Sequence, residues 1–177
     1  MRRKAILAGI VATLTVAVVA VAGNAMAAPL FGDDFEDGNS SGWTTSGGSW
    51  SVVADGTRVL RQSSTSSDAR ARAGSTGWTN YTVAVRVKPL AFNGANRFVA
   101  LLARAQSNTS YYYLALRSNN TVELKKLVGG SSTTFATAPV TVSINTWYTL
   151  SLSVSGATLT GRVNGGSAVT ATDRQCE

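Results

Sequence analysis

The stretch SYYYLALRS, residues 110–118, decides the fold of this 177-residue chain. A β-strand sends successive side chains to opposite faces of a sheet. Leu114 and Leu116 therefore share one face, and Tyr111 and Tyr113 share the other. The leucine face predicts burial in a core, so this segment is expected to be a strand with a second, aromatic face available for another partner.

Further short runs rich in β-branched and aromatic residues fill the chain from Trp50 onward, with turn residues between them. The runs are SWSVV, RVLRQ, YTVAVRVKP, RFVALLARA, SYYYLALRS, TVELKKLV, WYTLSLSV, ATLTGRV and SAVTAT. In YTVAVRVKP, valines alternate with more polar residues, a pattern typical of antiparallel sheets with one solvated face. FVALLA, residues 98–103, is apolar at every position and is predicted to be a central strand.

Many short strands, regular turns and no helical periodicity predict an all-β fold. The expected architecture is a two-sheet antiparallel β-sandwich of the jelly-roll type. A closed up-and-down barrel is the alternative architecture. Residues 28–177 contain no repeat or proline-rich linker, and they are long enough to form the core of one domain.

The first 27 residues have the pattern of an export leader. Residues 1–4 are basic, residues 5–22 are apolar, and Ala25-Met26-Ala27 supplies a small-residue cleavage site before Ala28. This pattern predicts an extracellular protein with no membrane contact after cleavage. An uncleaved anchor is the alternative, because the apolar stretch is just long enough to span a bilayer.

The ionisable residues exclude several kinds of chemistry. The chain has no histidine and one cysteine, Cys176, which rules out intramolecular disulfides, zinc sites of His and Cys ligands, and histidine-based catalytic triads. Without the three basic residues of the leader, 13 of the 16 Lys and Arg remain against 9 Asp and Glu, a net charge of +4. This mild charge suits an anionic polymer but not a nucleic acid. We expect a monomer.

Four segments of the chain resemble a known module: LFGDDFEDGNSSGWTTSGGSWSVVADGTRVLRQSS, DARARAGSTGWTNYTVAVRVKP, NRFVALLARAQSNTSYYYLALRSNNTVELKKLVGG and NTWYTLSLSVSGATLTGRVNG. The module is the non-catalytic concanavalin A-like (laminin G-like) jelly-roll domain of secreted actinobacterial polysaccharide-degrading enzymes, notably those with pectate lyase domains. The resemblance covers residues 30–166. It implies two antiparallel sheets and binding of plant cell-wall polysaccharide.

The ending of the chain departs from the pattern of that family. The family continues past the segment matching TATD, residues 170–173, with a phenylalanine, a glycine-rich strand and a closing FDD-like strand, whereas this sequence ends in RQCE. The resemblance therefore implies a domain without its last strand or strands. The strand expected around Phe31 to Phe35 would then present an unpaired edge.

The carboxylates do not favour catalysis. Glycosidases need two carboxylates at a defined separation, but glutamates occur only at positions 36, 123 and 177. Jelly-roll lyases of the alginate type use histidine, which is absent. We predict a secreted, non-catalytic carbohydrate-binding module. The alternatives are a truncated fragment of a pectate lyase or another polysaccharide-degrading enzyme, and a laminin G-like adhesion module.

The predicted carbohydrate-binding site is the aromatic face of residues 110–118 and its neighbours. The candidate residues are Tyr111, Tyr113, Arg117, Arg104 and Arg86. Sugar rings stack on aromatic side chains, and the planar guanidinium of arginine pairs with carboxylates, so the set suits an acidic glycan such as polygalacturonate. The alternative is an ordinary strand surface without a ligand.

An acidic cluster near the start of the mature chain offers oxygen ligands for a hard cation. Its members are Asp33, Asp34, Glu36 and Asp37. They predict at most a structural calcium ion, because the spacing is not that of an EF-hand loop. The alternative is a solvated acidic turn, and no other cofactor is expected.

Overall fold

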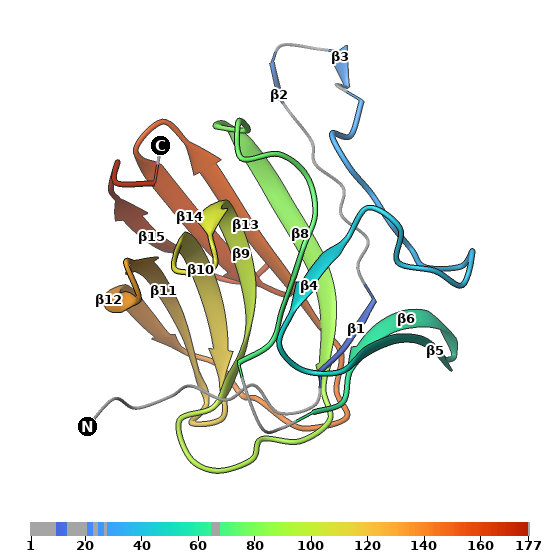
Figure 1. The fold of residues 1–177 in the computed structure, drawn as a ribbon. Coiled ribbons are helices and arrows are strands. Elements are labelled where there is room, and N and C mark those ends of the chain that lie inside the picture. Colours follow the sequence, from blue (N-terminus) through green and yellow to red (C-terminus); the bar gives the residue numbers. More distant parts are fainter. Residues whose placement is uncertain (1–9, 14–20, 23–24, 27, 65–67, 177) are drawn as a thin grey trace.

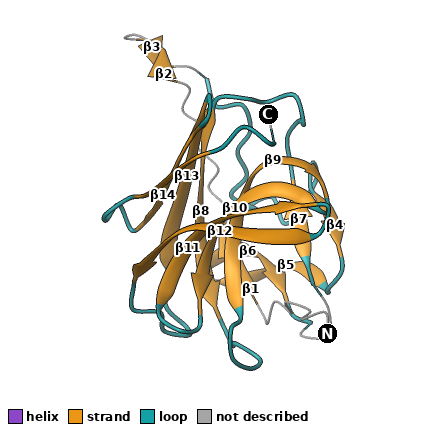
Figure 2. Ribbon diagram, turned by 90° about the vertical axis from the view of Figure 1, so that its left-hand side faces the viewer, coloured by secondary structure: helices purple, strands orange, loops and turns teal. Residues whose placement is uncertain are grey.

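A computed structural model describes residues 10–13, 21–22, 25–26, 28–64 and 68–176. All the regular secondary structure in these ranges is β-strand (Figure 2). The two larger sheets face each other as the layers of a sandwich (Figure 1), which confirms the predicted all-β sandwich. Within the described ranges, no helix could span a membrane.

The seven-stranded sheet has the spatial order β15 (Val169–Thr172), β14 (Thr158–Val163), β13 (Tyr148–Ser155), β8 (Tyr81–Pro89), β1 (Ile10–Thr13), β6 (Thr57–Gln62) and β5 (Trp50–Asp55). The four-stranded sheet has the order β12 (Ser131–Pro139), β11 (Thr121–Val128), β10 (Ser110–Arg117) and β9 (Phe98–Ser107). Two small ribbons pair β2 (Val21–Ala22) with β3 (Ala25–Met26), and β4 (Thr44–Ser46) with β7 (Arg70–Arg72). All neighbouring strands are antiparallel.

The main core lies between β10 and the facing strand β13. Tyr112, Leu114 and Leu116 of β10 are fully buried in it, together with Leu150 and Leu152 of β13. This is the face that the alternation in residues 110–118 predicts. The opposite face of β10 belongs to a second apolar cluster, which forms part of the candidate site described below.

The prediction of a central strand at residues 98–103 is wrong, because β9 lies at the end of the four-stranded sheet. Val99 and Leu101 enter the main core, while Ala100 and Leu102 pack in the second apolar cluster. An edge strand with both faces covered has the same apolar composition as a central strand. An apolar run therefore indicates that both faces of a strand are buried, but it does not indicate whether the strand pairs with one neighbouring strand or with two.

The expected strand around Phe31 to Phe35 is absent, and these residues form an irregular loop. The carboxylate of Asp33 accepts hydrogen bonds from the Phe35 backbone amide at 2.8 Å and from Nε1 of Trp43 at 2.7 Å. Such an aspartate-centred turn competes with strand pairing. Phe35 is fully buried and has a φ of 61°, which an extended strand does not allow.

Most of the predicted leader lies outside the described residues. Its described parts are β1, β2 and β3. β1 pairs with β6 on one side and β8 on the other, and so joins the two parts of the seven-stranded sheet (Figure 1).

Candidate functional site

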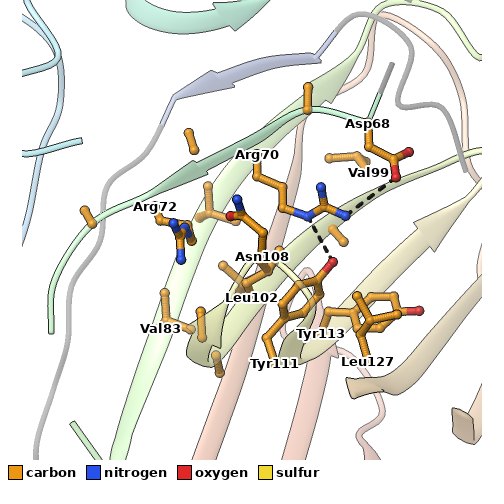
Figure 3. Close-up of a pocket in the computed structure, with 18 of the residues that line it drawn as sticks. Asp68, Arg70, Arg72, Val83, Val99, Leu102, Asn108, Tyr111, Tyr113 and Leu127 are labelled. Carbon is orange, nitrogen blue, oxygen red and sulfur yellow. Dashed lines mark hydrogen bonds and ion pairs between the residues drawn. The ribbon is translucent and has the colours of Figure 1, made fainter. Parts of the chain in front are cut away.

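A groove of about 1460 Å³ follows the edge strand β9 and the outer face of β10, and it reaches residues Leu60, Val85 and Val87 of the seven-stranded sheet. Its floor is the second apolar cluster, in which Tyr111, Tyr113 and Ala115 pack against Phe98 and Leu102. Its wall is the segment from Asp68 through β7, which crosses over this face of the sheet (Figure 3). The groove thus lies where a sheet face is only partly covered by a loop.

The tyrosines form a packed aromatic floor. The ring centroids of Tyr111 and Tyr113 are 5.6 Å apart in an edge-to-face arrangement, and Tyr113 stacks on Phe98 at 5.9 Å. Tyr111 is 7% exposed and Tyr113 is 5% exposed. Burial raises the pKa of Tyr113, and its hydroxyl forms a 2.8 Å hydrogen bond with Oγ of Ser132. The Tyr113 hydroxyl is therefore a neutral hydrogen-bonding group.

Arg70 connects the wall to the floor. Its Nε donates a hydrogen bond to the Tyr111 hydroxyl at 3.1 Å, and Nη2 lies 3.6 Å from a carboxylate oxygen of Asp68. The guanidinium carbon also lies 5.8 Å from the Tyr111 ring centroid. Figure 3 shows the side chains of Arg72 and Asn108 beside this contact in the groove.

The far end of the groove carries the cations Arg117 and Lys125. Both are held by Glu123, which accepts from Nη1 of Arg117 at 2.6 Å and from Nζ of Lys125 at 2.9 Å. Burial alone would raise the pKa of Glu123, but the hydrogen bonds from Lys125 and Arg117 lower it below its ordinary value. This glutamate remains ionised at neutral pH and positions two cations.

The structure brings together three of the five predicted site residues. Tyr111, Tyr113 and Arg117 line the groove. Arg104 is buried elsewhere, where its guanidinium donates to the carbonyls of Thr79 and Gly156, both at 2.8 Å. The open platform expected from alternation is instead a covered groove floor.

Arg86 also lies away from the groove. It is exposed on the seven-stranded sheet, with its guanidinium carbon 5.1 Å from the Trp147 ring centroid. The alternation of residues along a strand does not indicate which sheet the strand joins. It therefore could not predict that Arg86 lies outside the groove.

Sequence reasoning missed the residues of the wall. They are Asp68, Arg70 and Arg72, and Asn108 beside them in the groove was missed as well. The alternating arginines of DARAR were a usable signal for a half-exposed strand, but no local pattern indicates that this strand crosses the tyrosine face.

The acidic cluster does not form an evident metal site. Asp33, Asp34 and Asp37 border a shallow recess of about 430 Å³. The carboxylate of Asp34 accepts from the Glu36 amide at 3.1 Å, and that of Asp37 accepts from the Asn39 amide at 3.0 Å. Among the described residues, no group of three or more His, Cys, Asp or Glu side chains is placed to hold a metal ion. Structural calcium stays a prediction.

Comparison with known proteins places this architecture in a family. Residues 29–177 match the family model described as a 3-keto-alpha-glucoside-1,2-lyase-like domain. The chain belongs to this family. No curated protein matches the sequence.

A solved structure described as the carbohydrate binding module CBM66 from Bacillus subtilis resembles this chain with a TM-score of 0.60. The two sequences are 18% identical, and the match covers 77% of this chain and 82% of the other. This likeness supports the jelly-roll fold. The comparisons give no support to the more specific resemblance to modules found beside actinobacterial pectate lyases.

Proposed function

We propose that this protein is a secreted, non-catalytic carbohydrate-binding module that takes an acidic polysaccharide in the groove. The observation that carries the proposal is the Tyr111–Tyr113–Phe98 floor beneath a wall of arginines. Concave sites with apolar floors and a few convergent polar groups are typical ligand sites. The name of the CBM66 neighbour agrees with a carbohydrate ligand.

The charge of the groove favours an acidic sugar over a neutral one. Its lining contains five cationic side chains and one carboxylate: Arg70, Arg72, Arg97, Arg117, Lys125 and Asp68. Glu123 pairs with Arg117 and Lys125, and positive charge still exceeds negative charge when it is counted. Uronate carboxylates can accept paired hydrogen bonds from guanidinium groups, and the sugar C–H faces can pack on the aromatic floor. Polygalacturonate has both features, so it is our first candidate ligand.

Lyase chemistry is the second candidate, and the description of the family favours it. Elimination beside a carbonyl group needs a base for the carbon-bound proton and a cation for the developing oxyanion. In the groove, the Tyr111 hydroxyl and Arg70 are adjacent groups of these two kinds, with 3.1 Å between oxygen and Nε. Binding is the preferred proposal because the carboxylate of Asp68 is paired with Arg70 and the groove contains no histidine.

The direct test is affinity electrophoresis of the purified protein in gels with polygalacturonate, xylan or soluble cellulose. We expect retardation by polygalacturonate that decreases with added salt, because the charged contacts are screened. Arg72→Gln should reduce the retardation at least about fivefold, a loss of about 1 kcal/mol expected for one charge-assisted contact. The control is Arg162→Gln, which removes the same charge on β14, outside the groove.

Equal effects of the two variants, or no retardation by any glycan, would contradict a binding role for the groove. Catalysis is tested separately by following unsaturated products from polygalacturonate and the release of alcohol from a 3-keto-glucoside. We expect no turnover with either substrate. Turnover that is abolished by Tyr111→Phe would establish the lyase alternative.

A further inference from the structure

The seven-stranded sheet is continuous only because β1 fills the space between β6 and β8. Residues 10–12 pair with β6, and residues 10–13 pair with β8. In the described sheet order, β6 and β8 are not neighbours of each other. Without β1, both strands would present rows of unpaired backbone N–H and C=O groups, which are templates for another strand. We call this space the β6–β8 slot.

The two faces of the β6–β8 slot have different chemistry. Position 12 lies opposite Leu60 on one side and Val87 on the other, and both of these side chains are buried. Directly opposed residues in a sheet project to the same face. A strand in the slot therefore needs an apolar residue at position 12.

The alternate positions face cations. Position 11 lies opposite Arg61 on one side and Lys88 on the other, and position 13 lies opposite Arg86. Lys88 already forms an ion pair with Asp55. A carboxylate is thus accommodated on this part of the sheet surface, and further carboxylates at positions 11 and 13 would complement the remaining positive charge.

The sequence of β1 satisfies only half of these requirements. β1 supplies an apolar residue at position 12, but it has no acidic residue at positions 11 and 13, which lie opposite Arg61, Lys88 and Arg86. β1 also belongs to the segment that the cleavage pattern predicts to be removed. The present occupant is therefore both imperfectly matched and expected to leave.

We propose that the β6–β8 slot is a strand-accepting site for an extended polypeptide segment in which apolar residues alternate with carboxylates. β1 occupies this site until the leader is removed. The bound segment would add main-chain hydrogen bonds to β6 and β8, and its acidic residues would lie opposite Arg61, Lys88 and Arg86. This site adjoins the glycan groove, since Leu60 and Val87 line both, but strand binding and glycan binding are measured in separate experiments, so either proposal can fail without the other.

The first test uses the full chain with paired substitutions in β1. The variant Val11→Glu/Thr13→Glu should melt about 2–4 °C above Val11→Lys/Thr13→Lys, as expected for two opposed charge pairs in a protein of this size. The control exchanges are Thr170→Glu/Thr172→Glu and Thr170→Lys/Thr172→Lys in β15, where the opposed residues are the uncharged Thr160 and Thr158. If the difference in melting temperature between the Glu and Lys variants is the same in β1 as in β15, the proposal is overturned.

The second test measures binding of a strand in trans. In the full chain, Ala12→Asp places a charge opposite Leu60 and Val87, and so disfavours β1 in the slot. Fluorescence anisotropy would then compare labelled peptides AGIEAELT and AGIKAKLT, which correspond to residues 8–15 with Glu or Lys at positions 11 and 13.

We expect the Glu peptide to bind the Ala12→Asp chain at least about tenfold more tightly than the Lys peptide does, which corresponds to about 1.4 kcal/mol. It should also bind this chain more tightly than the unaltered chain. Equal binding of both peptides, or no binding to a folded Ala12→Asp chain, would refute the proposal. If Ala12→Asp prevents folding, the melting comparison still decides it.

Discussion

Arg70 donates a hydrogen bond from Nε to the hydroxyl of Tyr111, 41 residues further along the chain, at 3.1 Å. This contact holds the wall of the groove to its floor. Tyr111→Phe keeps the ring and removes the acceptor, so we expect the free energy of unfolding to fall by about 1 kcal/mol. Urea denaturation would measure the change. An unchanged midpoint would show that Arg70 finds an equivalent partner in the variant.

Tyr112 ties the C-terminal segment to the core. Its hydroxyl donates to the Asp173 carboxylate at 2.6 Å and accepts from the Cys176 amide at 3.2 Å. Tyr112→Phe should lower the free energy of unfolding by about 1–3 kcal/mol, because a half-buried carboxylate and a buried backbone amide lose a partner. Limited proteolysis should then release the C-terminal segment earlier.

The matched control for Tyr112 is Tyr113→Phe, which loses only the neutral hydrogen bond to Ser132. We expect a smaller loss of stability and no change in proteolysis of the C-terminal segment. A larger effect of Tyr113→Phe than of Tyr112→Phe would contradict the assigned role of the C-terminal contacts.

Stability should decrease in acid because two of the ion-paired carboxylates, Asp173 and Glu123, have lowered pKa values in the folded state. Burial acts to raise the pKa of Asp173, but hydrogen bonds from Lys126 and Tyr112 lower it below its ordinary value of 3.8. The pKa of Glu123 is likewise below its ordinary value of 4.5. A lowered carboxyl pKa contributes stability that is fully present above the unfolded value and is lost as the pH falls through the folded value.

The expected window therefore starts near the ordinary values of the two groups and extends to lower pH. Midpoints of urea unfolding between pH 7 and pH 2 would measure this dependence. Asp173→Asn and Glu123→Gln should each flatten the acidic slope and lower the stability at pH 7. A slope that survives in the double variant would assign the acid sensitivity to other carboxylates.

Gly161 is needed because β14 approaches Leu114 closely. A Cβ at this position would overlap Cδ1 of Leu114 and would lie 3.2 Å from Cγ2 of Val169. Gly161→Ala should destabilise the fold by about 1–3 kcal/mol through overpacking. The double variant Gly161→Ala/Leu114→Val should be more stable than the sum of the single effects predicts, since Leu114 is the obstacle.

Gly77→Ala is the control for this steric effect, because the only neighbour of a Cβ there is Ser75 Oγ at 3.6 Å. Thermal unfolding of the unaltered protein, Gly161→Ala, Leu114→Val and the double variant would give the coupling energy between the two positions. Additive effects of Gly161→Ala and Leu114→Val would show that the two residues do not share the same space.

The local sequence carried much of the strand pattern. The expected runs at 81–89 and 121–128 have the same bounds as β8 and β11, because their alternation matches sheets with one face in the core. β12 was missed, since SSTTFATAP has few large apolar residues and lies at a sheet edge with mostly exposed or half-buried side chains. An edge strand of this kind is formed by pairing with β11 and not by its own propensity.

The candidate site was predictable only in part. Alternation placed Tyr111 and Tyr113 on one face, and the same parity included Arg117, which the structure puts in the groove. Alternation along β9 places Arg104 on the same face as Ala100 and Leu102, but the strand is irregular at this position. Arg104 has a φ of 46°, and the pairing of β9 with β10 shifts register nearby. Such a bulge redirects side chains, and no alternation rule can anticipate it.

The sequence by itself determined the all-β class, the core face of β10 and the exclusion of histidine and disulfide chemistry, because these depend on composition and on the two-residue period of a strand. Tertiary structure decided that Arg70 covers Tyr111, that β9 is an edge strand and that β1 fills the space between β6 and β8. These features depend on which distant segments meet across a sheet. The contacts between distant segments are determined by burial of apolar surface and pairing of backbone groups over the whole chain. A short window of residues does not contain that information.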